Sequence, residues 1–327
     1  MTERTGYLAR QAIRYAISLF IIVTLIFLIP RMMPGDPFIS LLGEEVYYRS
    51  PDLVEQLKAQ YGLDQPLSEQ YLSYLHNLMQ GNLGYSFHCS QPVWDVIAYK
   101  MKWTIVLLIP SVILGAILGI VMGSLAGWQR GSGMDAWITS LFLFIYSMPH
   151  YWLAMLFVLI FAFYLGLFPL SGITAGGLEG VQKLRDVLWH MALPVFVLTL
   201  FGATYNFFIM RSSVVQVSGE GFVLTARAKG LAEREILFRH VLRNALLPLV
   251  TVIALDFGFM VSGALLVEIV FSWGGMGTLV YDAVLARDYP LLHGSFLVIA
   301  CCVLAANFLA DVLYAVLDPR IRGGNAA

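Results

Sequence analysis

Charge is scarce in this sequence. Asp, Glu, Lys and Arg make up only 13% of its 327 residues, and the mean hydropathy is +0.75. Soluble domains carry about 25% charged residues, so this composition excludes an ordinary soluble globular protein. The apolar residues, 59% of the chain, are gathered in runs long enough to cross a bilayer as helices. The sequence therefore predicts an all-α polytopic membrane protein.

Cysteines and catalytic motifs are also few. The three cysteines, Cys89, Cys301 and Cys302, have no metal-ligand spacing and form no even set for disulfides. His88 precedes Cys89 directly, and adjacent side chains on an extended backbone point in opposite directions. The chain has no phosphate-binding loop, no H-E-x-x-H and no G-x-S-x-G. We therefore expect no enzyme, no metal ion or cofactor in this chain, and no nucleic-acid partner.

The apolar runs predict six transmembrane helices. The third is interrupted by "SMPHYW", but splitting it at Pro149 leaves pieces too short to cross comfortably, so we interpret it as one span kinked by proline. No small-x-small cleavage site follows the first run, which predicts a retained span. The predicted spans are 12–30, 103–127, 136–166, 191–210, 246–272 and 291–317.

The distribution of basic residues predicts the orientation. With six spans, both termini lie on the same side as the 128–135 turn and the 211–245 loop, and that side holds 12 of the 20 basic residues. Because basic residues concentrate on the cytoplasmic side of a membrane, we expect both termini in the cytoplasm. The chain would then be a multi-pass protein of the cytoplasmic (inner) membrane. These residues are Arg4, Arg10, Arg14, Arg130, Arg211, Arg227, Lys229, Arg234, Arg239, Arg243, Arg320 and Arg322.

A polar segment follows the first span. "SPDLVEQLKAQYG" and "LSEQYLSYLHNLMQG" within it each have the pattern of a helix that a glycine ends. A small extracytoplasmic domain between the first two spans is therefore expected. The predicted division is 1–30 for the cytoplasmic N-terminus and first span, 31–102 for this domain, 103–317 for a five-helix core, and 318–327 for a cytoplasmic tail.

Several residues in the spans have side chains or positions that require a partner. Gly115, Gly119, Gly123 and Gly127 form one helix stripe, which predicts close packing against another helix. Ionised side chains are costly in hydrocarbon, so each carboxylate should face protein or water. Either a structural hydrogen bond or the lining of a translocation path fits this requirement. The candidates for a path or gate are Pro149, His150, Asp256 and Glu268, whereas Asp311 favours a helix contact.

The loop at 211–245 is basic yet patterned. In "LAEREILFRHVLRN" the residues Leu231, Ile236, Leu237 and Leu242 form an apolar face, and the charged residues lie elsewhere. This pattern predicts a short amphipathic helix on the cytoplasmic side. Its periodicity alone fits lipid as well as a protein partner.

Several motifs together resemble one family. "TARAKGL…RHVLRNALLP" at 225–248 is similar to the cytoplasmic EAA loop of ABC importer permeases, in the form of the dipeptide, oligopeptide and nickel permease family. The motifs "PGDP", "YGLDQPLSEQYLSYL", "GNLGYSF", "SMPHYW", "EIVFSWGGMG", "ARDYPLLHG" and "DPRIR" follow in that family's order along nearly the whole chain. The resemblance implies the type I ABC importer permease fold and a role in moving di- or oligopeptides, a nickel chelate or a related solute.

In such permeases the loop docks on a separate ATPase subunit. The resemblance implies that the contact residues are Thr225, Ala226, Arg227, Ala228, Lys229, Gly230 and Leu231. Two features depart from the family pattern. Leu224-Thr225-Ala226 replaces Glu-Ala-Ala, with Pro248 following Gly230 at the longer, peptide-type spacing, and Gly274 stands where proline is usual.

The resemblance also implies the partners. These are a second homologous permease, two ATPase subunits that bind ATP and magnesium, an extracytoplasmic solute-binding protein, and membrane lipid. In that scheme 31–101 and the 273–290 turn meet the binding protein or close the outer gate. An ion-coupled secondary transporter with Asp256 and Asp311 as ion sites is the main alternative, although the expected inverted repeat is missing. A membrane scaffold is a weaker third interpretation.

Overall fold

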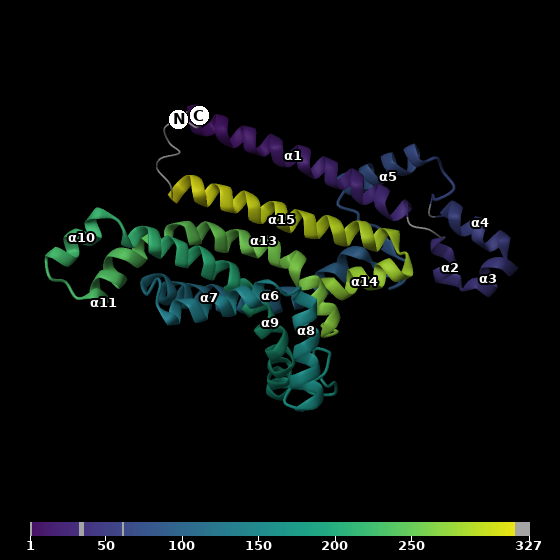
Figure 1. Cartoon of the computed structure of the whole chain (residues 1–327). Coiled ribbons are helices and arrows are strands. Elements are labelled where there is room, and N and C mark those ends of the chain that lie inside the picture. The colour runs from purple at the N-terminus through teal and green to yellow at the C-terminus, as the bar shows by residue number, and fades with distance from the viewer. Residues whose placement is uncertain (1, 33–35, 61, 318–327) are drawn as a thin grey trace. The chain divides into compact units, whose positions relative to one another are not determined.

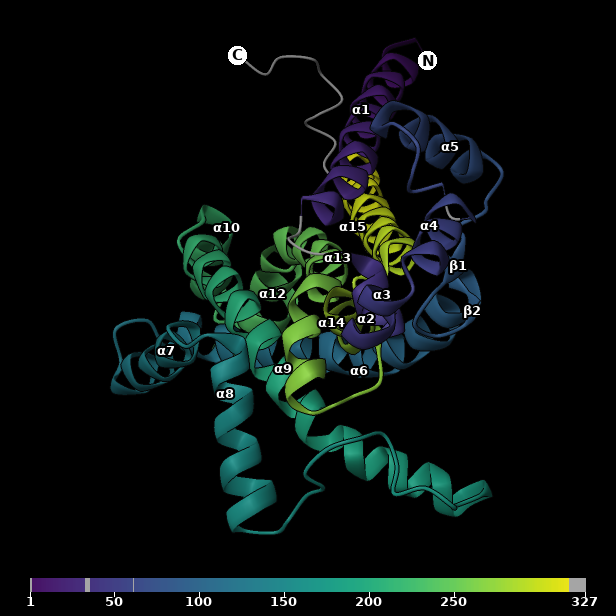
Figure 2. The same cartoon turned by 90° about the vertical axis from the view of Figure 1, so that its right-hand side faces the viewer.

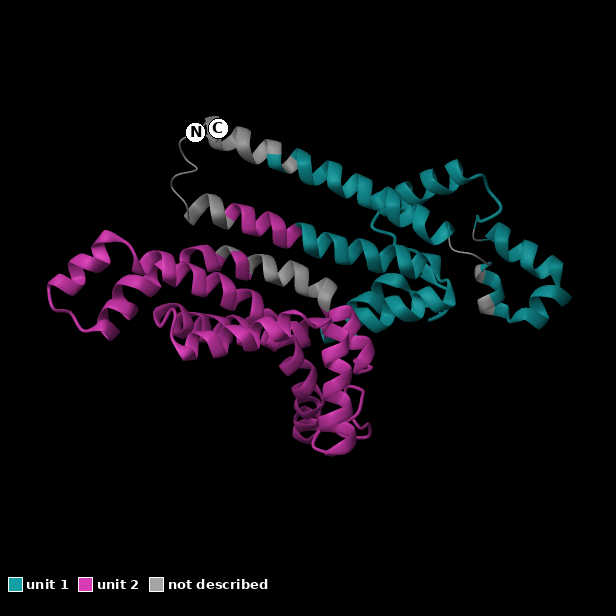
Figure 3. Cartoon of the chain, in the orientation of Figure 1, with its two compact units in different colours: residues 1–103, 274–304 teal, residues 104–273, 305–327 magenta. Residues whose placement is uncertain are grey.

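The protein is described by a computed structural model for residues 2–32, 36–60 and 62–317. Within these ranges the side chains of residues 2–10, 12, 37, 40, 41, 251, 254–263 and 313–317 are not described. The described chain is mostly helical and divides into two compact units, which Figure 3 distinguishes by colour. The helices α6 (Val93–Trp128) and α15 (Tyr289–Leu317) contribute residues to both.

The first unit comprises residues 1–103 and 274–304. In it α1 and α15 lie side by side (Figure 1, Figure 2), and Val23 and Ile26 of α1 pack against Leu297 of α15. Both helices predicted between the first two spans are present. One begins at Pro51, and the predicted glycines, Gly62 and Gly81, follow the two helices with φ values of 64° and 73°. The remaining elements are α1 (Thr2–Arg31), α2 (Pro37–Leu42), α3 (Glu44–Arg49), α4 (Pro51–Gln60), α5 (Leu67–Met79), β1 (Tyr85–Ser86), β2 (Gln91–Pro92) and α14 (Met276–Ala286).

The second unit comprises residues 104–273 and 305–327. Its longest helix, α9, extends beyond the predicted span 191–210 in both directions and ends at Ser218, just before the basic segment. The elements are α7 (Gly133–Tyr146), α8 (His150–Phe157), the π-helical η1 (Val158–Tyr164), α9 (Gly180–Ser218), α10 (Gly221–Ala228), α11 (Glu233–Glu235), the π-helical η2 (Ile236–Val241), α12 (Leu242–Ala245) and α13 (Leu247–Val270).

The glycine stripe of α6 packs against α9, as the sequence predicts. A Cβ atom added at Gly119 would lie 2.5 Å from the Asn206 Cβ and 2.8 Å from the Ala203 carbonyl oxygen. A Cβ at Gly123 or Gly127 would meet α9 backbone oxygens at 2.7 or 2.8 Å. Only glycine permits this approach, so the stripe fixes the α6–α9 pair at backbone contact.

Four described helices are long and apolar enough to cross a bilayer. They are Ile13–Arg31, Val93–Trp128, Gly180–Ser218 and Tyr289–Val312. A fifth candidate is the pair α7 and α8–η1, which bends by 99° at the break 147–149. The predicted kink therefore lies at Pro149, directly before α8, but the turn is much sharper than a proline kink. The helix α13 covers the predicted span 246–272, although the side chains of 254–263 lie outside the described residues.

Candidate functional site

The segment after α9 folds as a helical hairpin, residues 221–245. Its first helix, α10, ends in a reversal at Gly230, whose φ is 76°. The Leu231 N–H donates to the Ala226 carbonyl at 3.3 Å and the Gly230 N–H to the Arg227 carbonyl at 2.9 Å. This pair of bonds is the Schellman arrangement that ends helices, and it needs a left-handed residue at the position of Gly230. No atom lies within 4 Å of a Cβ built on Gly230, so the glycine is required by its backbone angle and not by a close approach.

The apolar face of the hairpin is buried against the chain itself. Val223 of α10 and Ile236 and Val241 of η2 are fully buried with Met210 of α9 and Leu249 of α13. Leu231 and Leu242, also predicted on this face, pack against the same cluster. The predicted amphipathic pattern is therefore confirmed, and the apolar face covers α9 and α13.

The turn of the hairpin exposes most of the residues that the resemblance singled out. Thr225, Arg227, Ala228, Lys229 and Gly230 are exposed, whereas Ala226 is buried and Leu231 is half-buried in the apolar cluster. The exposed group can therefore contact a partner, and the other two hold the turn in place.

Ion pairs order part of this surface. Arg227 donates from Nε and Nη2 to the two Glu233 oxygens at 2.9 and 3.1 Å, which ties α10 to α11 across the turn. The hydrogen bonds to Glu233 raise the pKa of Arg227 above its ordinary value. The Arg227 guanidinium also lies 5.5 Å from the Trp128 ring, at the end of α6.

Sequence analysis missed an exposed apolar group on the hairpin. Leu224 and Phe238 are each 60% exposed, and Phe222 is 42% exposed. Phe238 lines a shallow hollow with Ala232, Arg234 and Glu235. The sequence could have indicated this group, because the helical periodicity places Phe238 and Leu224 away from the buried face of their helices. Exposed apolar side chains beside charged ones are typical of a protein interface.

A partly buried ion pair joins the start of α7 to α9. Arg211 donates from Nε and Nη2 to the two Asp135 oxygens at 2.7 and 2.8 Å, and the Gly131 N–H donates to Asp135 at 2.9 Å. Ser132 accepts from the Asp135 N–H and caps α7. The sequence analysis missed this pair, although Ser-x-x-Asp before an apolar run is a recognisable helix start.

The four candidates for a path or gate lie in different surroundings, all in the second unit. Pro149 and His150 are exposed at the start of α8, and the His150 ring centroid lies 3.8 Å from that of Phe201 on α9. Glu268 is fully buried and accepts a 2.6 Å hydrogen bond from the Thr104 hydroxyl of α6. Asp256 lies in α13, but its side chain lies outside the described residues. Asp311 is half-buried in α15.

The first unit brings together the two segments that the resemblance placed on the outer side. Asp288, in the predicted 273–290 turn, is buried and accepts hydrogen bonds from the Ser86 hydroxyl at 2.6 Å and the His88 N–H at 2.9 Å. It also caps α15 by accepting from the Leu291 N–H. The backbone at His88 and Cys89 thus belongs to a turn held by Asp288 and Ser86.

An ion pair also holds Asp36, the residue before α2. Lys58 Nζ lies 2.6 Å from Asp36 Oδ2, and Asp36 accepts from the Phe38 N–H and the Tyr47 hydroxyl. Partial burial acts to raise the pKa of Asp36, but these hydrogen bonds hold it below its ordinary value. The carboxylate is therefore ionised at neutral pH and caps α2.

Comparison with known proteins identifies the family. The model of the binding-protein-dependent transport system inner membrane component matches residues 115–323, and the model of its N-terminal part matches 5–108. The chain belongs to this family. Its members are membrane permease subunits of ABC transporters and not enzymes, so this permease is a transport subunit.

Individual relatives agree along nearly their full length. The dipeptide transport system permease protein DppB of Escherichia coli (strain K12) is 37% identical over 326 residues, covering 94% of this chain and 96% of the relative. A putative peptide permease protein of Brucella suis biovar 1 (strain 1330) is 37% identical over 305 residues, covering 93% and 95%. A putative peptide transport system permease protein of Brucella abortus (strain 2308) is 36% identical over 313 residues, covering 95% and 98%.

Proposed function

We propose that this permease forms half of the path through which an ATP-driven importer moves di- or oligopeptides across the inner membrane. The names of the relatives support peptides over a nickel chelate as the solute. The second half of the path is a homologous permease, and an extracytoplasmic binding protein delivers the peptide. ATP and magnesium bind two separate ATPase subunits, because this chain has no phosphate-binding loop.

The observation that carries the proposal is the 221–245 hairpin. Its apolar face is already buried against α9 and α13, so lipid is not needed to cover it. What remains exposed is a rigid basic turn, flanked by Leu224 and Phe238, which fits a protein groove better than a lipid surface. Movement of an ATPase on this turn would act directly on α9, because Met210 and Val214 of α9 belong to the buried cluster of the hairpin.

The proposed topology has six spans with both termini in the cytoplasm. It counts α7 with α8–η1 as one broken span and α13 as another, in addition to the four continuous candidates. In this topology 31–102 and the 273–290 turn would lie on the extracytoplasmic side, and the 221–245 hairpin would lie in the cytoplasm with the ATPases. Pro149, His150 and Asp256 remain the proposed path residues, and Glu268 is proposed as a gate residue that acts through its bond to Thr104.

Reconstituted transport tests the proposal. The permease, its partner permease and the two ATPases are placed in proteoliposomes with ATP inside, and uptake of radiolabelled dialanine is measured with and without the binding protein. Uptake that requires both ATP and the binding protein is expected, and Asp256→Asn should keep the dependence on ATP. Uptake driven by a proton or sodium gradient without ATP would instead establish the ion-coupled mechanism.

A further inference from the structure

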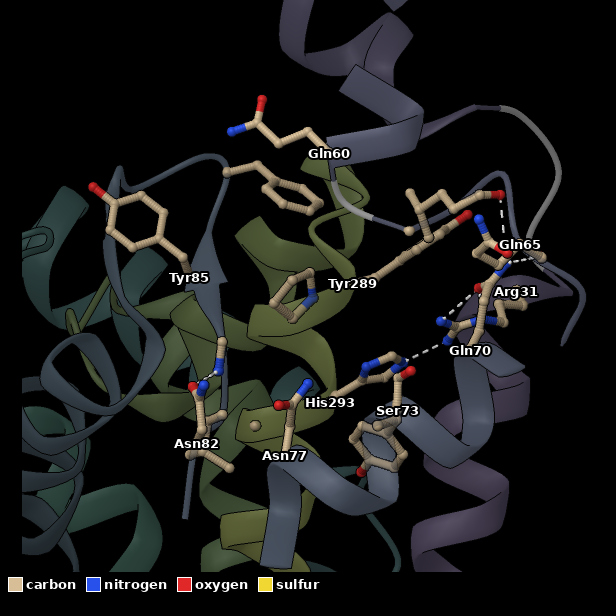
Figure 4. Close-up of a pocket in the computed structure, with 18 of the residues that line it drawn as sticks. Arg31, Gln60, Gln65, Gln70, Ser73, Asn77, Asn82, Tyr85, Tyr289 and His293 are labelled. Atoms are coloured by element: carbon tan, nitrogen blue, oxygen red, sulfur yellow. Dashed lines mark hydrogen bonds between the residues drawn. The ribbon is translucent and has the colours of Figure 1, made fainter. Parts of the chain in front are cut away.

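The first unit contains a pocket of about 380 Å³, a volume near the lower end for sites that bind small molecules. It lies between α5, the segment 82–87, the end of α1 and the start of α15 (Figure 4). Figure 4 shows Arg31 with Gln65 and Gln70 at one end and Asn82 with Tyr85 at the other. Every lining residue belongs to the first unit.

The pocket contains a cation that no carboxylate neutralises. Arg31 stacks its guanidinium 3.7 Å from the Phe27 ring centroid and donates from Nε and Nη2 to Gln70 Oε1, both at 3.1 Å. Its Nη1 bonds to the Phe27 carbonyl and to His293 Nε2. Among the described residues no carboxylate pairs with Arg31, and one Nη2 hydrogen remains available to a ligand. These neutral partners hold the guanidinium in place without cancelling its charge.

The same wall carries one anion. Glu69 on α5 lines the pocket, its side chain is exposed, and it forms no ion pair with any described residue. Glu69, Ser73 and Asn77 are spaced four residues apart, so they lie along one face of α5. The pocket therefore presents one positive and one negative side chain that do not pair with each other.

The rest of the lining suits a peptide bond. Four side-chain amides can each still donate and accept a hydrogen bond, and aromatic rings provide apolar contact for a small side chain. A ligand with a single charge would use only Arg31 or only Glu69, whereas a zwitterion can use both. The amides are those of Gln60, Gln65, Asn77 and Asn82, and the rings those of Tyr85, Phe87 and Tyr289. The Gln70 amide is already engaged by Arg31 and by the Leu63 and Gln65 carbonyls.

We propose that this pocket binds a short zwitterionic peptide, with its carboxylate on Arg31 and its ammonium group on Glu69. The inference rests on the proposed function and extends it: the extracytoplasmic segment of the permease would itself hold the solute after the binding protein releases it. Occupation of the pocket would favour zwitterionic peptides over blocked ones before they enter the path between the two permeases.

Binding measured without transport tests this site. The full chain is placed in lipid nanodiscs without ATP or binding protein, and its affinity is measured by calorimetry for dialanine, for N-acetyl-dialanine and for dialanine amide. The variants are Arg31→Gln and Glu69→Gln. Matched controls are Arg49→Gln and Glu45→Gln, an exposed ion pair on α3 outside the pocket.

A charged hydrogen bond is worth enough that each blocked end should weaken binding by about 10- to 100-fold. Arg31→Gln should bind dialanine amide as well as it binds dialanine. Glu69→Gln should bind N-acetyl-dialanine as well as it binds dialanine. Both control variants should bind all three peptides as the original chain does. Because Glu69 is exposed, its variant keeps the test valid even if Arg31→Gln fails to fold.

Three results would overturn the proposal. They are equal affinity for all three peptides, no binding of dialanine, and a phospholipid that native mass spectrometry finds bound to the original chain but not to Arg31→Gln. None of these would affect ATP-driven uptake in proteoliposomes, which tests the proposed function separately. If uptake fails while dialanine binds with the expected pattern, the site stands and the transport assignment does not.

Discussion

Arg211 on α9 binds both carboxylate oxygens of Asp135, the third residue of α7, at 2.7 and 2.8 Å. The pair ties the turn after α6 to the helix that leads into the 221–245 hairpin. The Asp135 side chain is only 6% exposed, whereas that of Arg211 is 28% exposed. In the proposed importer, α7 would therefore follow α9 when an ATPase moves the hairpin.

Removing one partner of this pair should destabilise the permease. Asp135→Asn leaves Arg211 with one neutral acceptor in place of a bidentate carboxylate, which we expect to cost about 2 kcal/mol or more. Thermal unfolding of the purified chain in detergent measures the change as a lower melting temperature. The matched control is Arg239→Gln, which breaks the exposed pair with Glu235 and should cost less than about 0.5 kcal/mol. Equal effects of the two variants would contradict a special role for Asp135.

A methyl group at Gly119 should weaken the α6–α9 contact. Its Cβ would lie 2.5 Å from the Asn206 Cβ, so the two helices must separate, and we expect Gly119→Ala to cost about 1 to 3 kcal/mol. The control is Gly133→Ala in α7, where no atom lies within 4 Å of the new Cβ. That variant should leave the melting temperature unchanged or slightly higher. A stable Gly119→Ala protein would contradict backbone contact along the stripe.

The features that the sequence predicted are those set by local spacing. Glycines four residues apart made the α6 stripe recognisable, and the positions of Ile236 and Leu237 defined the buried face of the hairpin. Pro149 marked the break in the third predicted span, because the residue before a proline disfavours helix. The direction of the 99° turn depends on packing and has no local signal.

Contacts between distant segments could not be predicted from pattern. Nothing in the sequence near Glu268 indicates that its hydrogen-bond partner is Thr104, 164 residues earlier. The sequence made Glu268 a candidate gate residue but did not predict this bond. Asp288 and Ser86 are 202 residues apart, and only the fold shows that they bond. The pocket around Arg31 was missed for the same reason, since its walls come from the end of α1, from residues between 60 and 87, and from the start of α15.

The proposed topology predicts which residues an impermeant thiol reagent can reach. Ser171 and Glu220 are both exposed, in the loop before α9 and the turn after it. Each is replaced by cysteine in a chain whose Cys89, Cys301 and Cys302 are changed to alanine. Ser171→Cys should react in intact cells, and Glu220→Cys only in inverted membrane vesicles. Reaction of both from the same side would mean that α9 does not cross the membrane, and the proposed span count would be wrong.

Gly230 should be the residue on which docking of an ATPase depends most. Its φ of 76° completes the Schellman turn, and a β-branched residue there costs about 1 to 2 kcal/mol in backbone strain. We therefore expect Gly230→Val to disturb the turn and reduce both co-purification of the ATPase subunits and ATP-driven uptake. Gly230→Asn should retain most of both, since asparagine tolerates the left-handed conformation.

The comparison with Arg234→Gln separates docking from lipid binding. If the hairpin only attached to anionic lipid, loss of Arg234 would weaken it by about 1 kcal/mol, and Gly230→Val would change little because every charge remains. Docking predicts the opposite order, because the exposed turn needs its shape more than any single charge. A fully coupled complex that carries Gly230→Val would show that the glycine does not determine coupling. If Arg227→Glu, which also breaks the pair with Glu233, were equally silent, the hairpin would not be the ATPase contact.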